Sequence, residues 1–204
     1  MVKIMVVGLG YVGLPISISF AKKFETYGFD INKEKINKYK NGIDITKTVV
    51  KRELEETKLN FTTNEKDINK ADYIIVTVPT PINENNEPDL KYIVNASEMI
   101  ARNIKKGATV VYESTVYPGT TEEICVPIIE KIAKMKLNID FFVGYSTERI
   151  NPGDSFYKFE NIAKIVSGST ESVTENIANL YAKCIKSQIV KVSSIKVAEA
   201  SKII

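Results

Sequence analysis

Short uninterrupted apolar runs alternate along the chain with longer amphipathic stretches. Runs of this kind are typical of parallel strands buried on both faces, and periodic stretches are typical of helices that cover such a sheet. Strands are predicted at residues 3–7, 26–30, 59–62, 73–78, 108–112, 139–143, 162–166 and 188–192. Helices are predicted directly after residue 13, at 32–41, as a short helix within 43–58, at 89–107, from 120 onward, at 171–184 and from 195. This alternation predicts an α/β protein with a Rossmann-type doubly wound, mainly parallel sheet.

Local signals refine the boundaries of two of these helices. Asp89 stands where it can cap the helix that follows it, and Thr120 with Glu123 matches a capping box for the next helix. Pro127 lies inside that second pattern, so we expect it to kink the helix or delay its regular part.

The first strand runs directly into a glycine-rich turn. Residues 8–13 read Gly-Leu-Gly-Tyr-Val-Gly and are followed by an apolar helix. In a dinucleotide-binding turn, the first glycine allows the tight bend and the second lets the backbone approach a pyrophosphate. The third lets the helix pack on the strand, while the helix amino terminus offers free amides to phosphates.

An acidic residue at the end of the second strand supports the same interpretation. Asp30 follows the glycines by about 20 residues, where a carboxylate can accept hydrogen bonds from an adenosine ribose. A second anion there would repel the 2′-phosphate of NADP, so we expect NAD. Lys35, five residues farther on, either reaches the adenosine end of the dinucleotide or is an ordinary solvent-facing lysine.

Polar residues gather where later strands end, and ligands bind at the carboxyl ends of strands in open α/β sheets. Pro79 and Pro81 stop one strand because proline has no amide hydrogen to donate, and Thr80 between them is either a cofactor contact or a plain loop threonine. Thr115 and Glu148 follow two other buried strands, where a catalytic pair could converge. Taken singly, each has an equally ordinary interpretation as a capping or surface residue.

Composition excludes several classes of protein. The 204 residues give room for one sizeable domain, or one domain and part of another. The net charge of +3 is small and the lysines are dispersed, so no nucleic-acid surface is indicated. No apolar run is long enough to span a bilayer and the amino terminus reads as a buried strand, which predicts a cytoplasmic protein.

The chain has few side chains suited to metal or nucleophilic chemistry. It contains no histidine, so histidine-based proton transfer and metal binding are excluded and no metal site is predicted. Cys125 and Cys184 stand singly in helical patterns, which favours small core residues over ligands or nucleophiles.

Six motifs in sequence resemble the NAD-binding half of the UDP-glucose/GDP-mannose dehydrogenase family. They cover the whole chain: GLGYVGLP at 8–15, GFDIN at 28–32, VPTP at 78–81, ESTVYPGTT at 113–121, STERINPG at 146–153 and VAEASKII at 197–204. The stretch at 149–154 is most similar to the branch that oxidises UDP-N-acetylhexosamines to uronic acids. UDP-glucose dehydrogenases usually carry a second glutamate where this chain has Pro152.

The resemblance implies an activity and site residues. Such enzymes oxidise the 6-hydroxyl of a UDP-sugar twice, with two NAD per product and a cysteine thiohemiacetal between the steps. By the resemblance, Thr115 and Glu148 hold the catalytic water and Lys202 donates to the oxyanion or relays a proton. Alone, Lys202 would be interpreted as a helix-face lysine. The residues expected to bind the cofactor are Gly8, Gly10, Tyr11, Val12, Gly13, Asp30, Lys35, Pro79, Thr80 and Thr115.

The chain departs from the family pattern in two ways. Thr147 replaces the usual proline, which alters loop stiffness but removes no catalytic atom. The nucleophilic cysteine motif, of GGxCxPKD type, is absent, and the catalytic asparagine would lie one helical turn past Lys202. We therefore expect a front half: an NAD-binding domain at 1–192 and the start of a central, dimerisation helix at 193–204, from an enzyme that forms homodimers.

Two alternatives stay open at this point. The chain could be a stand-alone NAD-binding module or pseudoenzyme that performs no dehydrogenation. It could also be a Rossmann reductase of the β-hydroxyacid type, in which a long helix with a catalytic lysine follows the Rossmann unit, but the VPTP, ESTV and ERINPG motifs disfavour this class.

Overall fold

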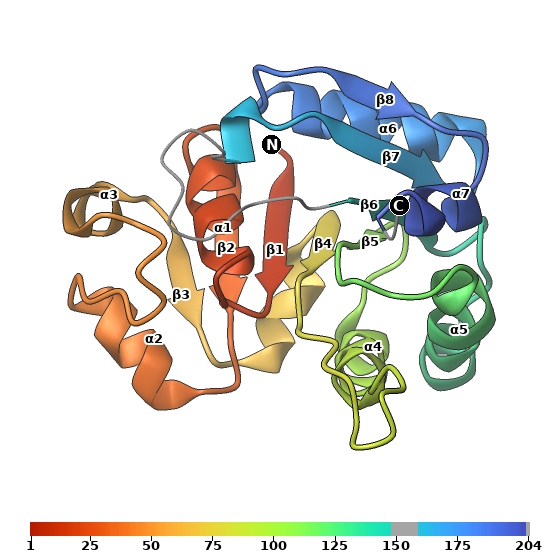
Figure 1. The fold of residues 1–204 in the computed structure, drawn as a ribbon, viewed down its shortest axis with the longest axis horizontal. Helices are drawn as coiled ribbons and strands as arrows, with labels where there is room; N and C mark the ends of the chain where they lie inside the picture. Colours follow the sequence, from red (N-terminus) through yellow and green to blue (C-terminus); the bar gives the residue numbers. More distant parts are fainter. Residues whose placement is uncertain (148–158, 203–204) are drawn as a thin grey trace.

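The computed structural model describes residues 1–147 and 159–202, and the strands of these residues form a single sheet. The strands are β1 (Lys3–Val7), β2 (Glu25–Phe29), β3 (Asn60–Thr62), β4 (Tyr73–Val76), β5 (Thr109–Tyr112), β6 (Phe142–Ser146), β7 (Lys164–Gly168) and β8 (Ile189–Lys191). Their order across the sheet is β3-β2-β1-β4-β5-β6-β7-β8, with β1 near the middle (Figure 1). The strands β1 to β6 are parallel, whereas β7 is antiparallel to β6 and parallel to β8. The mainly parallel, doubly wound sheet is therefore confirmed.

Helices cover both faces of this sheet. They are α1 (Gly13–Ala21), α2 (Lys33–Lys40), α3 (Lys51–Glu56), α4 (Lys91–Asn103), α5 (Val126–Ala133), α6 (Glu171–Ala182) and α7 (Ile195–Ala200). Short 3₁₀ segments are η1 (Glu65–Lys70) and η3 (Phe159–Asn161), and η2 (Thr120–Cys125) is a π-helical segment. Alternate strand residues point to opposite faces. Accordingly, Ile4 and Val6 of β1 join the core under α1, α2, α3 and α6, whereas Met5 and Val7 join the core under α4, α5 and α7.

The strand order reverses direction next to β1. The chain leaves β1 for β2 on one side and later returns to place β4 on its other side. This is the point in an open α/β sheet where a crevice forms beyond the carboxyl ends of the strands. The crevice lies beside the glycine-rich turn that follows β1.

The sequence misplaced one strand by three residues. Residues 139–143 were expected to be extended, but β6 runs from Phe142 to Ser146 and Ile139 is 66% exposed. A tight turn occupies the start of the expected strand: Asn138 has a left-handed backbone with φ of 62°, and its N–H donates to the carbonyl of Phe141 at 2.8 Å. The turn, rather than the apolar side chain of Ile139, decides where β6 begins.

Two helix-start predictions had opposite outcomes. The carboxylate of Asp89 accepts the N–H of Lys91, the first residue of α4, at 2.9 Å, although Leu90 stands between them. The capping box of Thr120 and Glu123 is wrong, because the Thr120 hydroxyl donates to the carbonyl of Tyr117 at 2.7 Å. The segment from Thr120 to Cys125 is a π-helical turn, and regular helix begins only at Val126 next to Pro127, as the proline predicted.

The described part of the last helix packs on the same core as the sheet. Ile195 and Ala198 of α7 are 1% and 0% exposed and belong to the core beneath α4 and α5. Figure 1 shows α7 beside β6, close to the carboxyl end of the described chain. Within residues 1–147 and 159–202, no helix combines the length and apolar character that a bilayer crossing demands.

Candidate functional site

The glycine-rich turn after β1 has the backbone geometry of a phosphate-binding turn. Gly8 has φ of +95°, a conformation that favours glycine, and its N–H donates to the carbonyl of Phe29 at 2.9 Å. A Cβ on Gly13 would lie 1.9 Å from the Gly8 oxygen, so α1 approaches β1 as closely as only glycine permits. A Cβ on Gly10 would meet no atom within 4 Å, which leaves open space over the backbone at that point.

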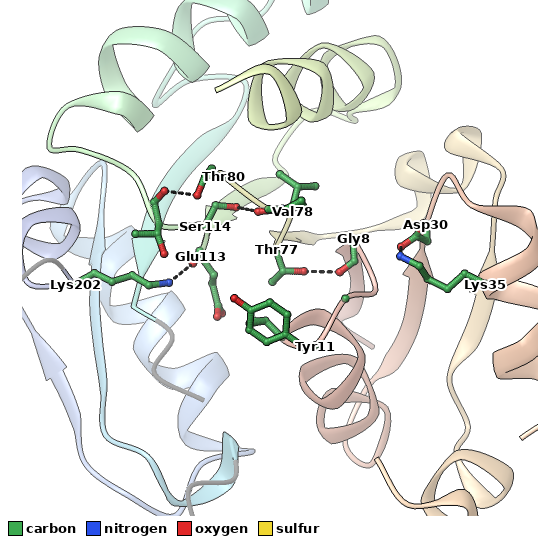
Figure 2. A pocket seen from close by; sticks show the side chains of 14 residues that line it. Gly8, Tyr11, Asp30, Lys35, Thr77, Val78, Thr80, Glu113, Ser114 and Lys202 are labelled. Carbon is green, nitrogen blue, oxygen red and sulfur yellow. Dashed lines mark hydrogen bonds and ion pairs between the residues drawn. The ribbon is translucent and has the colours of Figure 1, made fainter. Parts of the chain in front are cut away.

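Asp30 lies directly after β2 and faces this turn. Its carboxylate accepts the N–H of Leu9 at 3.0 Å and that of Asn32 at 2.9 Å. Lys35 completes the cluster with an ammonium 2.7 Å from Oδ2 of Asp30 (Figure 2). A carboxylate has about four acceptor positions, so one remains for a hydroxyl donor from a ligand. Lys35 is thus not an ordinary solvent-facing lysine: its side chain is 21% exposed and paired with the acid.

A cavity of about 270 Å³ brings most of the expected site residues together. Its lining includes the turn after β1, the acid after β2, and the exits of β4 and β5. Of the residues expected from the sequence, it contains Gly8, Gly10, Tyr11, Val12, Asp30, Lys35, Pro79, Thr80, Thr115 and Lys202. Gly13 lies beneath the turn and does not line the cavity, and Glu148 lies outside the described residues.

A second cavity of about 390 Å³ adjoins the first on the side of Asp30. The two share Gly8, Asp30, Lys35, Val78 and Pro79. The rest of its lining is largely apolar and comes from the end of β2 and from α4: Phe29, Ile31, Asn32, Tyr92, Asn95, Ala96 and Met99, with Val7. Together the cavities form one cleft, in which the Asp30–Lys35 ion pair lies between the end lined by the exits of β4 and β5 and the apolar end lined by α4.

Three hydrogen bonds hold the loop after β5 to the segment that follows β4 and to β6. The Ser114 hydroxyl donates to the carbonyl of Val78 at 2.6 Å, and the Thr80 hydroxyl donates to the carbonyl of Thr115 at 2.5 Å. From β6, the buried Tyr145 hydroxyl donates to the carbonyl of Ser114 at 2.9 Å. Burial, with the nearby carboxylates of Glu199 and Glu113, raises the pKa of Tyr145, so this hydroxyl keeps its proton.

The same bonds leave the Thr115 side chain facing the cleft. Thr115 is exposed, and no hydrogen bond to its hydroxyl is found among the described residues. From the other side, the Lys202 ammonium donates to the carbonyl of Glu113 at 2.9 Å, and Figure 2 shows it reaching across to that strand exit. Thr115 and Lys202 therefore both line the cleft, beside a loop backbone that is held by hydrogen bonds.

A buried ion pair lies directly under this loop. The Lys164 ammonium is 2.7 Å from the Glu113 carboxylate and donates to the carbonyl of Thr147 at 3.0 Å. The Tyr181 hydroxyl donates to the same carboxylate, and the ammonium stands 4.8 Å from the centre of the Tyr181 ring. Lys164 thereby ties the exit of β5 to the exit of β6.

Sequence reasoning missed several residues that build the site. Thr77 fixes the glycine turn through a 2.7 Å hydrogen bond from its hydroxyl to the carbonyl of Gly8. Tyr39, 1% exposed, holds the same turn by donating to the carbonyl of Leu9 at 2.8 Å. Neither Thr77 nor Lys164 has a local signal, because their partners lie 69 and 51 residues away. Tyr39 had one, since it follows Ile36 at helical spacing and therefore marks the inward face of α2.

Neither cysteine belongs to the site. Both are buried, and burial raises the pKa of each thiol to about 11, so both stay protonated near neutral pH. The prediction of two core residues is confirmed. No group of three or more Cys, Asp or Glu side chains suited to a metal ion occurs in residues 1–147 and 159–202.

Comparison with known proteins agrees with this geometry. Residues 2–185 match the model of the UDP-glucose/GDP-mannose dehydrogenase family, NAD binding domain. The chain belongs to this family. The cofactor of the family's domain is NAD, as the acid after β2 predicted, and the open space over Gly10 and the remaining acceptor position on Asp30 fit a dinucleotide.

Relatives and solved structures extend the match. The chain is 52% identical to the UDP-N-acetyl-D-glucosamine 6-dehydrogenase of Pseudomonas aeruginosa over 203 residues, which are 99% of this chain and 48% of that protein. It is 51% identical to Protein CapL of Staphylococcus aureus, over 98% of this chain and 47% of that one. The structure of a UDP-D-ManNAc dehydrogenase from Pyrococcus horikoshii superposes with a TM-score of 0.91 at 32% identity, over 98% of this chain and 49% of that chain. The chain thus spans about half the length of the relatives it matches.

Proposed function

We propose that this chain is the cofactor-binding half of an NAD-dependent dehydrogenase that oxidises the 6-hydroxyl of a UDP-N-acetylhexosamine to the uronic acid. The observation that carries the proposal is the single cleft in which the glycine turn, Asp30, Thr115 and Lys202 meet. The relatives at about half identity include proteins named UDP-N-acetyl-D-glucosamine 6-dehydrogenase, which supports the choice of sugar.

Different residues of the cleft would bind different parts of NAD. The turn at Gly8 and Gly10 would receive the pyrophosphate, Asp30 the adenosine ribose, and the apolar cavity beside Tyr92 and Met99 the adenine. When bound, NAD accepts a hydride from the substrate. Pro79 and Thr80, at the exit of β4, would border the nicotinamide end.

Thr115 and Lys202 would serve the reacting end. A hydroxyl on a fixed backbone can hold a water in one position, and an ammonium can stabilise an oxyanion or relay a proton. Because the carbonyls of Glu113, Ser114 and Thr115 all accept hydrogen bonds, the loop does not need to reorganise during the reaction. Glu148 is proposed as the partner of Thr115 in holding the water.

The nucleophile for the second oxidation would come from outside this chain. Neither buried cysteine can reach a sugar in the cleft. We therefore expect NAD binding without turnover. A homodimer of the whole protein and a cytoplasmic location are part of the same proposal.

Calorimetry on the isolated chain tests the proposal. NAD should bind with micromolar affinity and NADP more weakly, and a panel of UDP-sugars should show little selectivity. Binding of NAD without any turnover after addition of the missing half would favour the alternative of a stand-alone NAD module. Absence of NAD binding would refute the cofactor assignment, and steady oxidation of UDP-N-acetylglucosamine by the chain alone would refute its incompleteness.

A paired substitution sharpens this test. Asp30→Asn removes the charge that a ribose hydroxyl would meet, and a hydrogen bond to a charged group contributes about 1.5–3 kcal/mol. The affinity for NAD should therefore fall about 10- to 150-fold. Asp67→Asn is the matched control. Asp67 lies on η1, outside both cavities, where it pairs with Lys70 and accepts a hydrogen bond from the Thr62 hydroxyl of β3. Equal losses in the two variants would contradict the ribose assignment.

A further inference from the structure

Glu199 is a fully buried carboxylate on α7, with 0% of its surface exposed. One of its oxygens accepts the N–H of Gly119 at 2.5 Å and the other accepts the N–H of Thr121 at 2.9 Å. A buried anion is stable only when hydrogen bonds replace its hydration, and the first amides of a helix are donors without partners in their own helix. Glu199 therefore takes the place that the predicted capping box at Thr120 left empty.

Lys202 follows Glu199 on the same stretch of chain. Lys202 lies three positions after Glu199, which is close to one helical turn. Lys202 donates to the carbonyl of Glu113 at 2.9 Å, while Glu199 accepts from Gly119 and Thr121. Glu199 and Lys202 therefore form hydrogen bonds with both ends of the segment 113–121, and Thr115 lies between these contacts in the sequence.

We propose that Glu199 is a positioning residue that locks α7 onto the segment 113–121 and so keeps the Lys202 ammonium at the cleft beside Thr115. We call the two hydrogen bonds from Gly119 and Thr121 to Glu199 the clamp. Its meaning for catalysis rests on the proposed function of Lys202.

A second carboxylate joins the same two elements and provides a control. Glu123 of η2 pairs with Lys196 of α7 at 2.6 Å, but their side chains are 63% and 53% exposed. Exposed ion pairs contribute little to stability, so Glu123→Gln should leave the docking of α7 unchanged. Glu199→Gln keeps the shape of the side chain, but its NH₂ group is a donor. One of the two backbone N–H groups then faces a donor instead of an acceptor.

The experiment measures amide hydrogen exchange and lysine acylation on the same chain. In Glu199→Gln, the amides of Gly119 and Thr121 should exchange at least tenfold faster, and Lys202 should be acylated at least fivefold faster. In Glu123→Gln, both rates should stay as in the unmodified chain. Lys164 reports on global unfolding because it is 1% exposed, so its acylation should stay slow in both variants.

The possible outcomes separate the clamp from the proposed function. Unchanged exchange at Gly119 and Thr121 together with unchanged acylation of Lys202 in Glu199→Gln would overturn the clamp, even if NAD binds. If the unmodified chain does not bind NAD, the proposed function is overturned and the clamp remains supported.

If Glu199→Gln does not fold, amide hydrogen exchange of the unmodified chain tests the clamp. At low denaturant concentrations, the amides of Gly119, Thr121 and Ala198 should then open as one unit, with the same dependence on denaturant. Opening of Ala198 at a lower denaturant concentration than Gly119 and Thr121 would refute the clamp.

Discussion

Two alanine substitutions in the glycine turn should separate folding from cofactor binding. In Gly13→Ala, the new Cβ would lie 1.9 Å from the Gly8 oxygen and 2.4 Å from the Thr77 hydroxyl, whereas real contacts below 3.0 Å are essentially never found. The start of α1 must then move away from β1 by about 1.1 Å to lengthen the contact with the Gly8 oxygen from 1.9 Å to 3.0 Å. The hydrogen bond from Thr77 to Gly8 would be strained or lost.

The magnitude follows from these two effects. Overpacking of a close contact costs about 1–3 kcal/mol, and a lost hydrogen bond about 1 kcal/mol more. We therefore expect Gly13→Ala to lose roughly 3 kcal/mol of folding free energy. For a domain of this size, 1 kcal/mol corresponds to roughly 2–4 °C, so the melting temperature should fall by about 6–12 °C.

Gly10→Ala should have the opposite profile. Its Cβ meets no atom within 4 Å, and Gly10 has no positive φ, so the fold should tolerate the methyl group within about 0.5 kcal/mol. The methyl group would occupy the space through which a pyrophosphate approaches the backbone. The affinity for NAD should fall at least tenfold while the melting temperature changes by about 2 °C or less.

Thermal unfolding by circular dichroism and NAD titration by calorimetry measure both quantities on the same samples. Stable Gly13→Ala protein would refute the close-packing argument. Full NAD affinity in Gly10→Ala would show that the pyrophosphate does not pass over this residue.

Two further predictions concern buried groups. Lys164→Met should cost about 3–5 kcal/mol in urea unfolding, because it removes the ammonium that lies 2.7 Å from the buried Glu113 carboxylate. The double variant Lys164→Met/Glu113→Gln should recover part of that loss, and a double variant no more stable than the single one would refute the pairing. Cys125 and Cys184 should react with a thiol reagent only when the chain unfolds, since burial raises the pKa of both to about 11. The pKa of each thiol in the folded chain lies above the unfolded value of about 8.5, so the thiols contribute fully to stability below that pH and lose this contribution as the pH rises toward 11. The free energy of unfolding, measured at increasing alkaline pH, should therefore fall steadily over this range.

The sequence by itself determined the parts of this protein that depend on neighbours in the chain. The apolar run of β1, the left-handed conformation at Gly8 and the acid at Asp30 all follow from local alternation and turn chemistry. The identity of the cofactor followed as well, because the glycine turn and the acid are read from one unit of about thirty residues.

Local signals failed where a distant contact or a competing turn overrode them. The capping box at Thr120 was plausible in sequence, but Glu199, 78 residues away from Thr121, supplies the acceptor instead. The strand β6 began three residues late because the turn at Asn138 closes first.

Only the tertiary structure decided how Thr115 and Lys202 come to line one cleft. Thr115 and Lys202 stand 87 positions apart in the sequence and reach one cavity because α7 packs on β6 and β7. The supports beneath them, such as Lys164 with Glu113, join residues that carry no common local pattern. Strands and turns arise from short-range sterics and hydrophobic periodicity. A site held by long-range hydrogen bonds between buried groups exists only once the sheet has brought those groups out of water and into contact.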